Sequence, residues 1–333
     1  MKKYLSRLVF LVPVLFCGVL LLCPDWQARL LAASNIGYGF YGTATDDILL
    51  QNTATGDYRL FEVSAGQVVG NHKVAVYSSS GYSFQGIGSF DGDLINDVLL
   101  RSNSTGVFKQ FFFSSGNVSS VATPSYWASA DWAYVGVGDF DGFNWTAGVL
   151  TRNQITGAYR LYPPYSAPQS LGLYADLNIQ VVAIKDFDRD RDFDVLTRSS
   201  ATGKYKLFEI ENNAVVSVSS VNLWSSSDWQ FVAAADLDGD LDSDIILRNI
   251  NTGVWRYSLM QNRQVVASGS LPLFTSSDWV FQQAADLDGD WDFDILLRSA
   301  SNGKWRAFTL QNASVTGNYS FNLYSSADWQ IQN

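Results

Sequence analysis

The chain has 333 residues, with 32 acidic side chains against 22 basic ones and a formal net charge of −10 at pH 7. This surplus of negative charge argues against nucleic acid and anionic membranes as partners, because both repel an acidic surface. Two cysteines and one histidine offer little for a disulfide framework, a histidine-rich metal site or a Ser-His-Asp triad.

The first 33 residues contain the regions of an export signal in their usual order. Residues 2–7 are basic, residues 8–23 form an apolar run that is short for a bilayer span, and small residues follow at Ala32-Ala33-Ser34. The sequence therefore predicts a cleaved signal peptide at 1–33, with an uncleaved membrane anchor as the alternative. We expect a secreted protein, extracellular or at the cell surface, with the periplasm as a further compartment, and no membrane contact after cleavage.

The remainder, residues 34–333, repeats one phrase six times. In the copy DLDGDLDSDIILRN, aspartates at the odd-numbered positions of a short loop run directly into an apolar strand. The copies are spaced by 50, 50, 47, 50 and 50 residues, which is the period of a repeat architecture. Position one of the loop falls at Gly39, Ser89, Asp139, Asp186, Asp236 and Asp286.

Each copy reads as four short strands. In the fifth copy these are 229–237, 244–249, 254–260 and 264–274, with a tight turn at Thr252-Gly253 that recurs in the other copies. The first strand is rich in glycine and alanine, which suits strands that crowd around an axis. Four antiparallel strands per unit of this length are typical of a propeller blade, so we predict an all-β, six-bladed β-propeller as a single domain.

The two ends of the repeat region complement each other. Residues 328–333 copy the start of another unit and stop before its loop, whereas Gly37 lies where such a fragment would continue. We therefore predict that the termini meet in one closing blade, because closure removes exposed strand edges. The alternative is a seventh, incomplete blade.

Three loops carry a complete set of carboxylates, which would repel one another without a cation. Oxygen-only ligands of this kind favour Ca²⁺ over zinc or copper, so about three Ca²⁺ sites are expected, with a fourth, weaker one in the second copy. The candidate ligands of the three complete loops are Asp186, Asp188, Asp190, Asp192 and Asp194; Asp236, Asp238, Asp240, Asp242 and Asp244; and Asp286, Asp288, Asp290, Asp292 and Asp294. The weaker set is Asp91, Asp93 and Asp97.

The remaining loops depart from the pattern. The third copy keeps Asp139 and Asp141 but places Phe143, Trp145 and Ala147 at positions five, seven and nine. The first copy keeps only Asp47, which is interpreted as a turn residue.

The run D-[FL]-D-G-D-x-x-x-D, followed by I-L-L-R, T-G and a later S-x-D-W, resembles the FG-GAP or VCBS repeat family, which includes the integrin α-subunit propellers. The resemblance covers about residues 34–333. It implies Ca²⁺ held between the first and second strands of a blade, in extracellular proteins used for adhesion, ligand binding or carbohydrate recognition. Two features depart from the family: integrin propellers have seven blades, and the family's glycine at loop position six is replaced by Leu94, Arg191, Leu241 and Trp291.

No catalytic set stands out. The one histidine, His72, lies in a copy without metal ligands, and no pair of carboxylates free of the loops suggests a glycosidase. The sequence thus predicts a non-catalytic recognition or adhesion module whose partner is an extracellular glycan or protein. Two alternatives are a Ca²⁺-dependent polysaccharide lyase and a self-assembling subunit of an extracellular fibre. Trp224, Trp255 and Trp305 are candidate platforms for sugar stacking.

Overall fold

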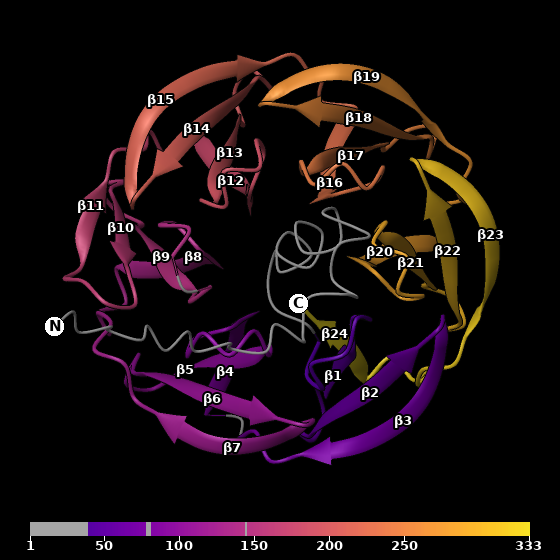
Figure 1. Cartoon of the computed structure of the whole chain (residues 1–333), viewed down its shortest axis with the longest axis horizontal. Coiled ribbons are helices and arrows are strands. Elements are labelled where there is room, and N and C mark those ends of the chain that lie inside the picture. The colour runs from indigo at the N-terminus through magenta and orange to yellow at the C-terminus, as the bar shows by residue number, and fades with distance from the viewer. Residues whose placement is uncertain (1–38, 78–80, 144) are drawn as a thin grey trace, which may run out of the picture.

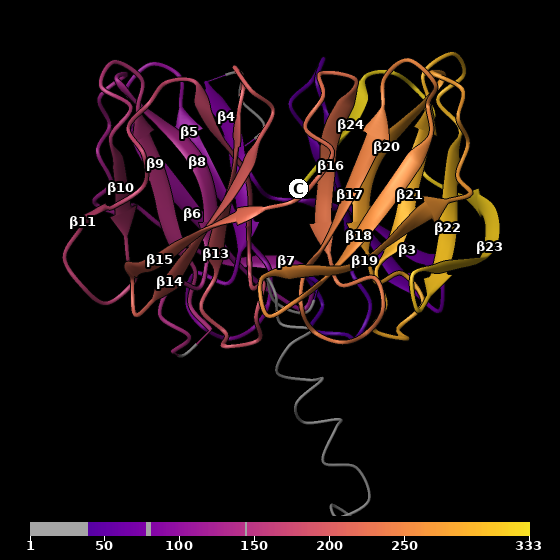
Figure 2. The same cartoon turned by 90° about the horizontal axis from the view of Figure 1, so that it is seen from above.

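A computed structural model describes residues 39–77, 81–143 and 145–333 of the chain. These residues form six four-stranded antiparallel sheets arranged as blades around a central axis (Figure 1). Seen from the side, the ring is a short cylinder with the C-terminus near its axis (Figure 2). The predicted signal peptide at 1–33 lies outside the described residues. Among the described residues there is no helix long and apolar enough to cross a membrane.

The strands are given from the innermost to the outermost of each blade. Blade one contains β24 (Trp329–Gln332), β1 (Ile48–Asn52), β2 (Tyr58–Ser64) and β3 (Gln67–Val74). Blade two contains β4 (Tyr82–Gly88), β5 (Asp97–Ser102), β6 (Phe108–Ser114) and β7 (Asn117–Ala122). Blade three contains β8 (Trp132–Gly138), β9 (Gly148–Asn153), β10 (Tyr159–Tyr162) and β11 (Gln169–Leu171).

Blades four to six follow the same order. Blade four contains β12 (Ile179–Lys185), β13 (Asp194–Ser199), β14 (Tyr205–Glu211) and β15 (Ala214–Val221). Blade five contains β16 (Trp229–Ala235), β17 (Asp244–Asn249), β18 (Trp255–Gln261) and β19 (Gln264–Leu271). Blade six contains β20 (Trp279–Ala285), β21 (Asp294–Ser299), β22 (Trp305–Gln311) and β23 (Ser314–Phe321).

The ring closes through the two ends of the repeat region, as predicted. The C-terminal strand β24 pairs with β1, with Trp329 opposite Asn52 and Gln332 opposite Leu49. Because β24 completes blade one instead of starting a new blade, the prediction of six blades is confirmed and the seven-bladed alternative is wrong.

The hydrophobic core is divided among the junctions between blades. Each of six buried clusters joins side chains of two neighbouring blades. In blade five, Ile245 and Leu247 face blade four, while Ile246 between them faces blade six. This is why the second strand of a blade is a continuous apolar run: both of its faces are covered, as in any sheet buried on two sides.

The recurring turn glycines bring neighbouring blades together. Gly253 has a φ of 72°, a left-handed conformation that glycine adopts without strain. A Cβ atom at this residue would lie 1.7 Å from the carbonyl oxygen of Thr275. Glycine is therefore required at this residue for two reasons: the turn needs a left-handed conformation, and the backbone at Thr275 leaves no room for a Cβ atom.

Candidate metal-binding loops

The acidic loops join the first and second strands of each blade and are linked to one another around the ring. In all six blades, the backbone N–H at loop position eight, or its structural equivalent, donates to the carbonyl at position one of the preceding blade, at 2.5–3.0 Å. The bond from Asp46 to Asp286 closes this circle between blades one and six. The loop backbone is thus held in place by the ring, whether or not its side chains can bind a cation.

Position one of a complete loop is an aspartate whose carboxylate caps the loop. In blade five, the Asp236 carboxylate accepts backbone N–H groups from Gly239 and Leu241, both at 2.8 Å. Position six adopts the left-handed conformation, with φ values of 81° at Leu241 and 79° at Trp291. The strain expected of bulky residues at this position is therefore present in the fold.

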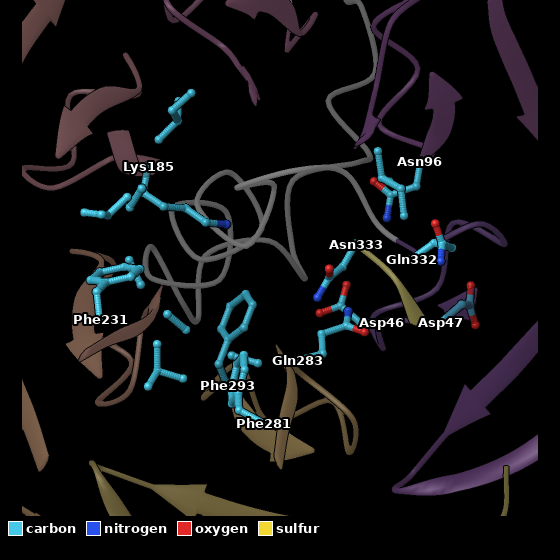
Figure 3. Close-up of a pocket in the computed structure, with 18 of the residues that line it drawn as sticks. Asp46, Asp47, Asn96, Lys185, Phe231, Phe281, Gln283, Phe293, Gln332 and Asn333 are labelled. Carbon is cyan, nitrogen blue, oxygen red and sulfur yellow. The ribbon is translucent and has the colours of Figure 1, made fainter. Parts of the chain in front are cut away.

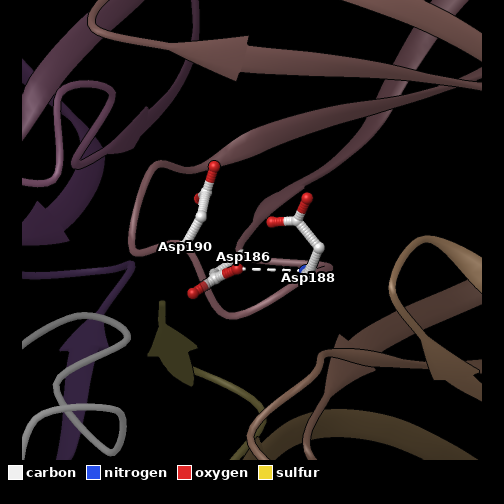
Figure 4. A group of neighbouring side chains, drawn as sticks. All are labelled: Asp186, Asp188 and Asp190. Atoms are coloured by element: carbon white, nitrogen blue, oxygen red, sulfur yellow. Dashed lines mark hydrogen bonds between the residues drawn. The ribbon is translucent and has the colours of Figure 1, made fainter.

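Three groups of carboxylates converge within these loops. The candidate ligand atoms in each group lie within 4.8 Å of one another, and Figure 4 shows the blade-four group. The groups are Asp186, Asp188 and Asp190; Asp236, Asp238 and Asp244; and Asp286, Asp288 and Asp290. In two of them a buried oxygen, Oδ1 of Asp188 and of Asp238, has no hydrogen-bond partner.

The carboxylates within each group repel one another. Burial, together with repulsion from neighbouring carboxylates, raises the pKa of Asp190 to about 7, that of Asp236 to about 7 and that of Asp290 to about 6. Without a cation, these loops therefore hold protons close to neutral pH. A divalent ion would replace the protons and remove the repulsion.

Position seven does not join the convergent groups. One oxygen of Asp192, Asp242 and Asp292 accepts the backbone N–H of Asn212, Asn262 and Asn312, respectively, in the outer hairpin of the same blade. The other oxygen faces the preceding blade: Oδ1 of Asp292 lies 2.6 Å from where a Cβ atom of Gly239 would be. These aspartates, which are predicted ligands, hold the loop against its neighbours through these contacts.

Position nine supports the blade through backbone hydrogen bonds. Asp194, Asp244 and Asp294 each accept a backbone N–H from the third strand, at 2.8–2.9 Å. Of the three, only Asp244 also joins a convergent group. Asp47 makes the equivalent bonds in blade one, where it is 5% exposed and accepts the N–H groups of Phe40, Tyr41 and Val63. Asp47 is therefore a buried brace, and its interpretation as a turn residue was incomplete.

The second blade lacks a convergent group among the described residues. Ser89 replaces the first carboxylate, and its hydroxyl accepts the Leu94 N–H at 3.2 Å. Asp91 and Asp93 accept backbone N–H groups within the loop, while Asp97 braces the blade through Phe90 and Phe113. The three aspartates of the predicted weaker set therefore do not converge on one point.

The third loop contains one additional residue. Trp145, with a φ of 55°, takes the left-handed place of position six, and the Ala147 N–H makes the bond that position eight makes elsewhere. Gly148, the first residue of β9, therefore occupies position nine. The sequence alignment that put Trp145 at position seven and Ala147 at position nine is corrected by this insertion.

Two arginines distinguish the three acidic groups from one another. Arg189, at position four where other loops have glycine, forms ion pairs with Asp240 and Asp242 of blade five, at 2.6 and 3.2 Å. Arg263 forms an ion pair with Asp188 of blade four at 3.2 Å and another with Glu209. In blade six, no lysine or arginine of the described residues forms an ion pair with Asp286, Asp288 or Asp290.

Two proposed sugar platforms belong to the core. Trp255 and Trp305 are 1% and 2% exposed, and their indole N–H groups donate to backbone carbonyls. Each packs against the arginine one residue before the end of the second strand of its blade, Arg248 or Arg298. Those arginines donate to carbonyls of the next blade, including Trp279 and Trp329, so they link blades.

The third proposed platform, Trp224, is partly buried and packs against Arg256.

No protein-family model matches the chain, and no curated protein matches it in sequence. Among solved structures, a streptogramin B lyase is similar with a TM-score of 0.51 and 8% identity, covering 84% of this chain and 80% of that one. A catalytically inactive virginiamycin B lyase from Staphylococcus aureus with quinupristin has a TM-score of 0.47 and 8% identity, covering 85% and 86%. The β-propeller domain of Cps50 (Swd1) from Myceliophteria thermophila has a TM-score of 0.43 and 9% identity, covering 82% and 84%. At these identities the likeness shows the propeller fold alone.

Proposed function

We propose that the protein is a secreted, Ca²⁺-stabilised β-propeller that acts as a non-catalytic recognition module for an extracellular glycan or protein. The blade-six loop carries the Ca²⁺ part of this proposal. Its three carboxylates converge, no lysine or arginine within the described part of the chain forms an ion pair with them, and they range from the buried Asp286 to the exposed Asp290. A solvent ion can therefore reach a site whose charge the protein itself leaves unbalanced.

The chemistry of the donors points to a hard cation. All candidate ligands are carboxylate oxygens, which suit Ca²⁺ and do not favour the softer metals that prefer nitrogen or sulfur. Asp286, Asp288 and Asp290 would hold the ion in blade six, with the corresponding groups in blades four and five. Arg263 pairs with Asp188 of the blade-four group, and Arg189 holds Asp240 of the blade-five loop in an ion pair, so we expect blade six to bind most tightly.

Calorimetric titration of Ca²⁺ into chelator-treated protein tests this part of the proposal. The wild type should bind Ca²⁺, and its melting temperature should rise with the ion, because a ligand of the folded state alone stabilises that state by mass action. Asp288→Ala should remove the tightest site. The matched control is Asp131→Ala, an exposed aspartate outside the acidic loops, which should leave the titration unchanged. An Asp288→Ala titration equal to that of the wild type would refute the assignment.

The recognition part of the proposal is supported by the third blade, whose loop exchanges carboxylates for aromatic residues. Phe143 is 69% exposed, and Tyr165, from the link between β10 and β11, is 66% exposed. The Tyr165 hydroxyl lies 3.0 Å from Oγ1 of Thr146, which ties that link to the altered loop. Exposed aromatic rings beside polar groups are suited to stacking on sugars or to anchoring a protein partner.

A glycan array probed with and without Ca²⁺ tests the recognition part. Phe143→Ala and Tyr165→Ala should each weaken binding to any glycan that the wild type retains. Ile155→Ala is the control, because Ile155 is equally exposed, at 69%, but lies in the turn at the opposite end of the same blade. Equal loss in all three variants would argue against this surface.

A further inference from the structure

The axis of the propeller contains a cavity of about 300 Å³. It is lined by the inner strands β12, β16, β20 and β24 and by residues near the loops of blades one and two (Figure 3). The acidic groups of the loops do not line it. It therefore requires an explanation separate from Ca²⁺ binding.

One wall carries a lysine where the repeat calls for a small residue. Lys185 ends β12, and its equivalents at the ends of the other complete inner strands are Gly88, Gly138, Ala235 and Ala285. Lys185 is partly buried, its ammonium points toward the axis in Figure 3, and it has no hydrogen bond or ion pair among the described residues. A cation held in a cavity wall without a counterion is costly unless a ligand supplies the negative charge.

The cavity that Lys185 lines also contains the carboxylate of Asp46. The cavity therefore has a positive group on blade four and a carboxylate on blade one, which lies across the ring (Figure 1).

Acceptor oxygens without partners lie on that opposite wall. Asn96, which is 9% exposed, and Gln283 each have a buried side-chain oxygen without a hydrogen-bond partner. Asp46 accepts the backbone N–H of Asp286 through Oδ2. Buried acceptors of this kind are rare in folded proteins unless a ligand or water completes them. In Figure 3, Gln283 lies beside Asp46, and together they present acceptors suited to an ammonium group.

Between the two polar ends, the wall is apolar. Phe231, Phe281 and Phe293 line the cavity, and Figure 3 shows their rings beside Lys185 and Gln283. A ligand that fits all three regions has an anionic group, a cationic group and an apolar side chain.

We propose that the axial cavity binds a small zwitterion of the amino-acid type with an apolar side chain. Its carboxylate pairs with Lys185, its ammonium donates to Asp46 and Gln283, and its side chain packs on the phenylalanines. The convergent carboxylates do not line this cavity, so ligand binding and Ca²⁺ binding are measured separately and either proposal can fail alone.

Calorimetry on the full chain with three matched probes tests the proposal. L-Phenylalanine carries both charges, 3-phenylpropionate lacks the ammonium, and phenethylamine lacks the carboxylate. L-Phenylalanine should bind, and each of the other probes should bind at least about tenfold more weakly, because one charge-assisted contact is lost. The result should be the same in chelator and in Ca²⁺. No binding of L-phenylalanine at millimolar concentrations, or equal binding of the three probes, would overturn the proposal.

Residue variants assign the two ends of the ligand. Lys185→Ala copies Ala235 and Ala285, and Gln283→Ala copies Ala233, so both variants place a residue that a sister blade already accepts. Lys185→Ala should reduce L-phenylalanine affinity about tenfold and leave phenethylamine unaffected, whereas Gln283→Ala should weaken the probes that carry the ammonium. Lys204→Ala, at an exposed lysine outside the cavity, is the control. Unchanged L-phenylalanine affinity in Lys185→Ala, with the melting temperature preserved, would refute the site.

Discussion

The loops of blades four to six and those of blades one to three share one backbone frame but differ in their side chains. The inter-blade hydrogen bond at position eight is present in all six loops. The residue at position six is left-handed in blades two to six but not in blade one. Within the described ranges, only blades four to six bring three carboxylates together. The comparison teaches that the ring itself builds the loop, and that convergent carboxylates are an addition that the fold does not need.

The largest expected effect is the loss of a brace in the half without convergent groups. Asp47→Ala would leave the buried N–H groups of Phe40, Tyr41 and Val63 without an acceptor. The free energy of unfolding should fall by about 3 kcal/mol or more. Urea denaturation in chelator measures this loss. Asp290→Ala is the comparison, and it should change the value by no more than about 0.5 kcal/mol, because Asp290 is exposed and repelled by its neighbours. Similar losses in the two variants would contradict the division of roles.

The pH dependence of stability should separate the metal-free protein from the Ca²⁺-bound one. The pKa values of Asp190, Asp236 and Asp286 are raised to about 7, from 3.8, chiefly by burial. The folded state then binds more protons than the unfolded state between these values, so stability falls as the pH rises from about 4 to about 7. Melting temperatures in chelator should fall in the same way as the pH rises. Asp97 in blade two, whose pKa is also raised, adds to this pH dependence in both conditions. Ca²⁺ should flatten the slope by displacing the protons, and an equal slope with and without Ca²⁺ would count against bound ions.

A smaller effect should follow from exchanging the residue at position four. Arg189→Gly removes the ion pairs with Asp240 and Asp242 and places the residue that other loops have at this left-handed position. Ca²⁺ affinity at blade five should rise about tenfold, because a competing cation is gone. Gly239→Arg should lower the Ca²⁺ affinity of blade six, because the new arginine would lie beside Asp292 of that blade. Calorimetry on both variants tests the pair, and an unchanged affinity in Arg189→Gly would show that the arginine does not tune the site.

The smallest effect is expected from the strained residue at position six. Leu94→Gly in blade two and Leu241→Gly in blade five each replace a residue whose φ is 70° or 81°. Each change should raise the free energy of unfolding by up to about 1 kcal/mol in chelator, because glycine adopts this conformation without strain. Denaturation curves of the two variants should agree if the backbone frame is shared. A difference between them would show that the acidic loop has a conformation of its own.

Much of the fold could be predicted because the same strand and turn pattern occurs in six copies along the chain. The period, the turn glycines and the complementary ends led to six blades and to closure through β24 and β1. The carboxylates at positions one, three and five were likewise predicted to gather, and they do so in blades four and six. In blade five, Arg189 holds Asp240, and Asp244 takes its place in the group.

The sequence by itself determined the architecture and the places where acidic side chains accumulate, since both depend on local pattern and on spacing along one chain. Only the tertiary structure decided what each aspartate does, because its partners come from neighbouring blades: Asp292 lies against Gly239 and Asp242 pairs with Arg189. The same reason hid the axial cavity. Lys185 and Asp46 stand far apart in the sequence and face one cavity only because the ring closes.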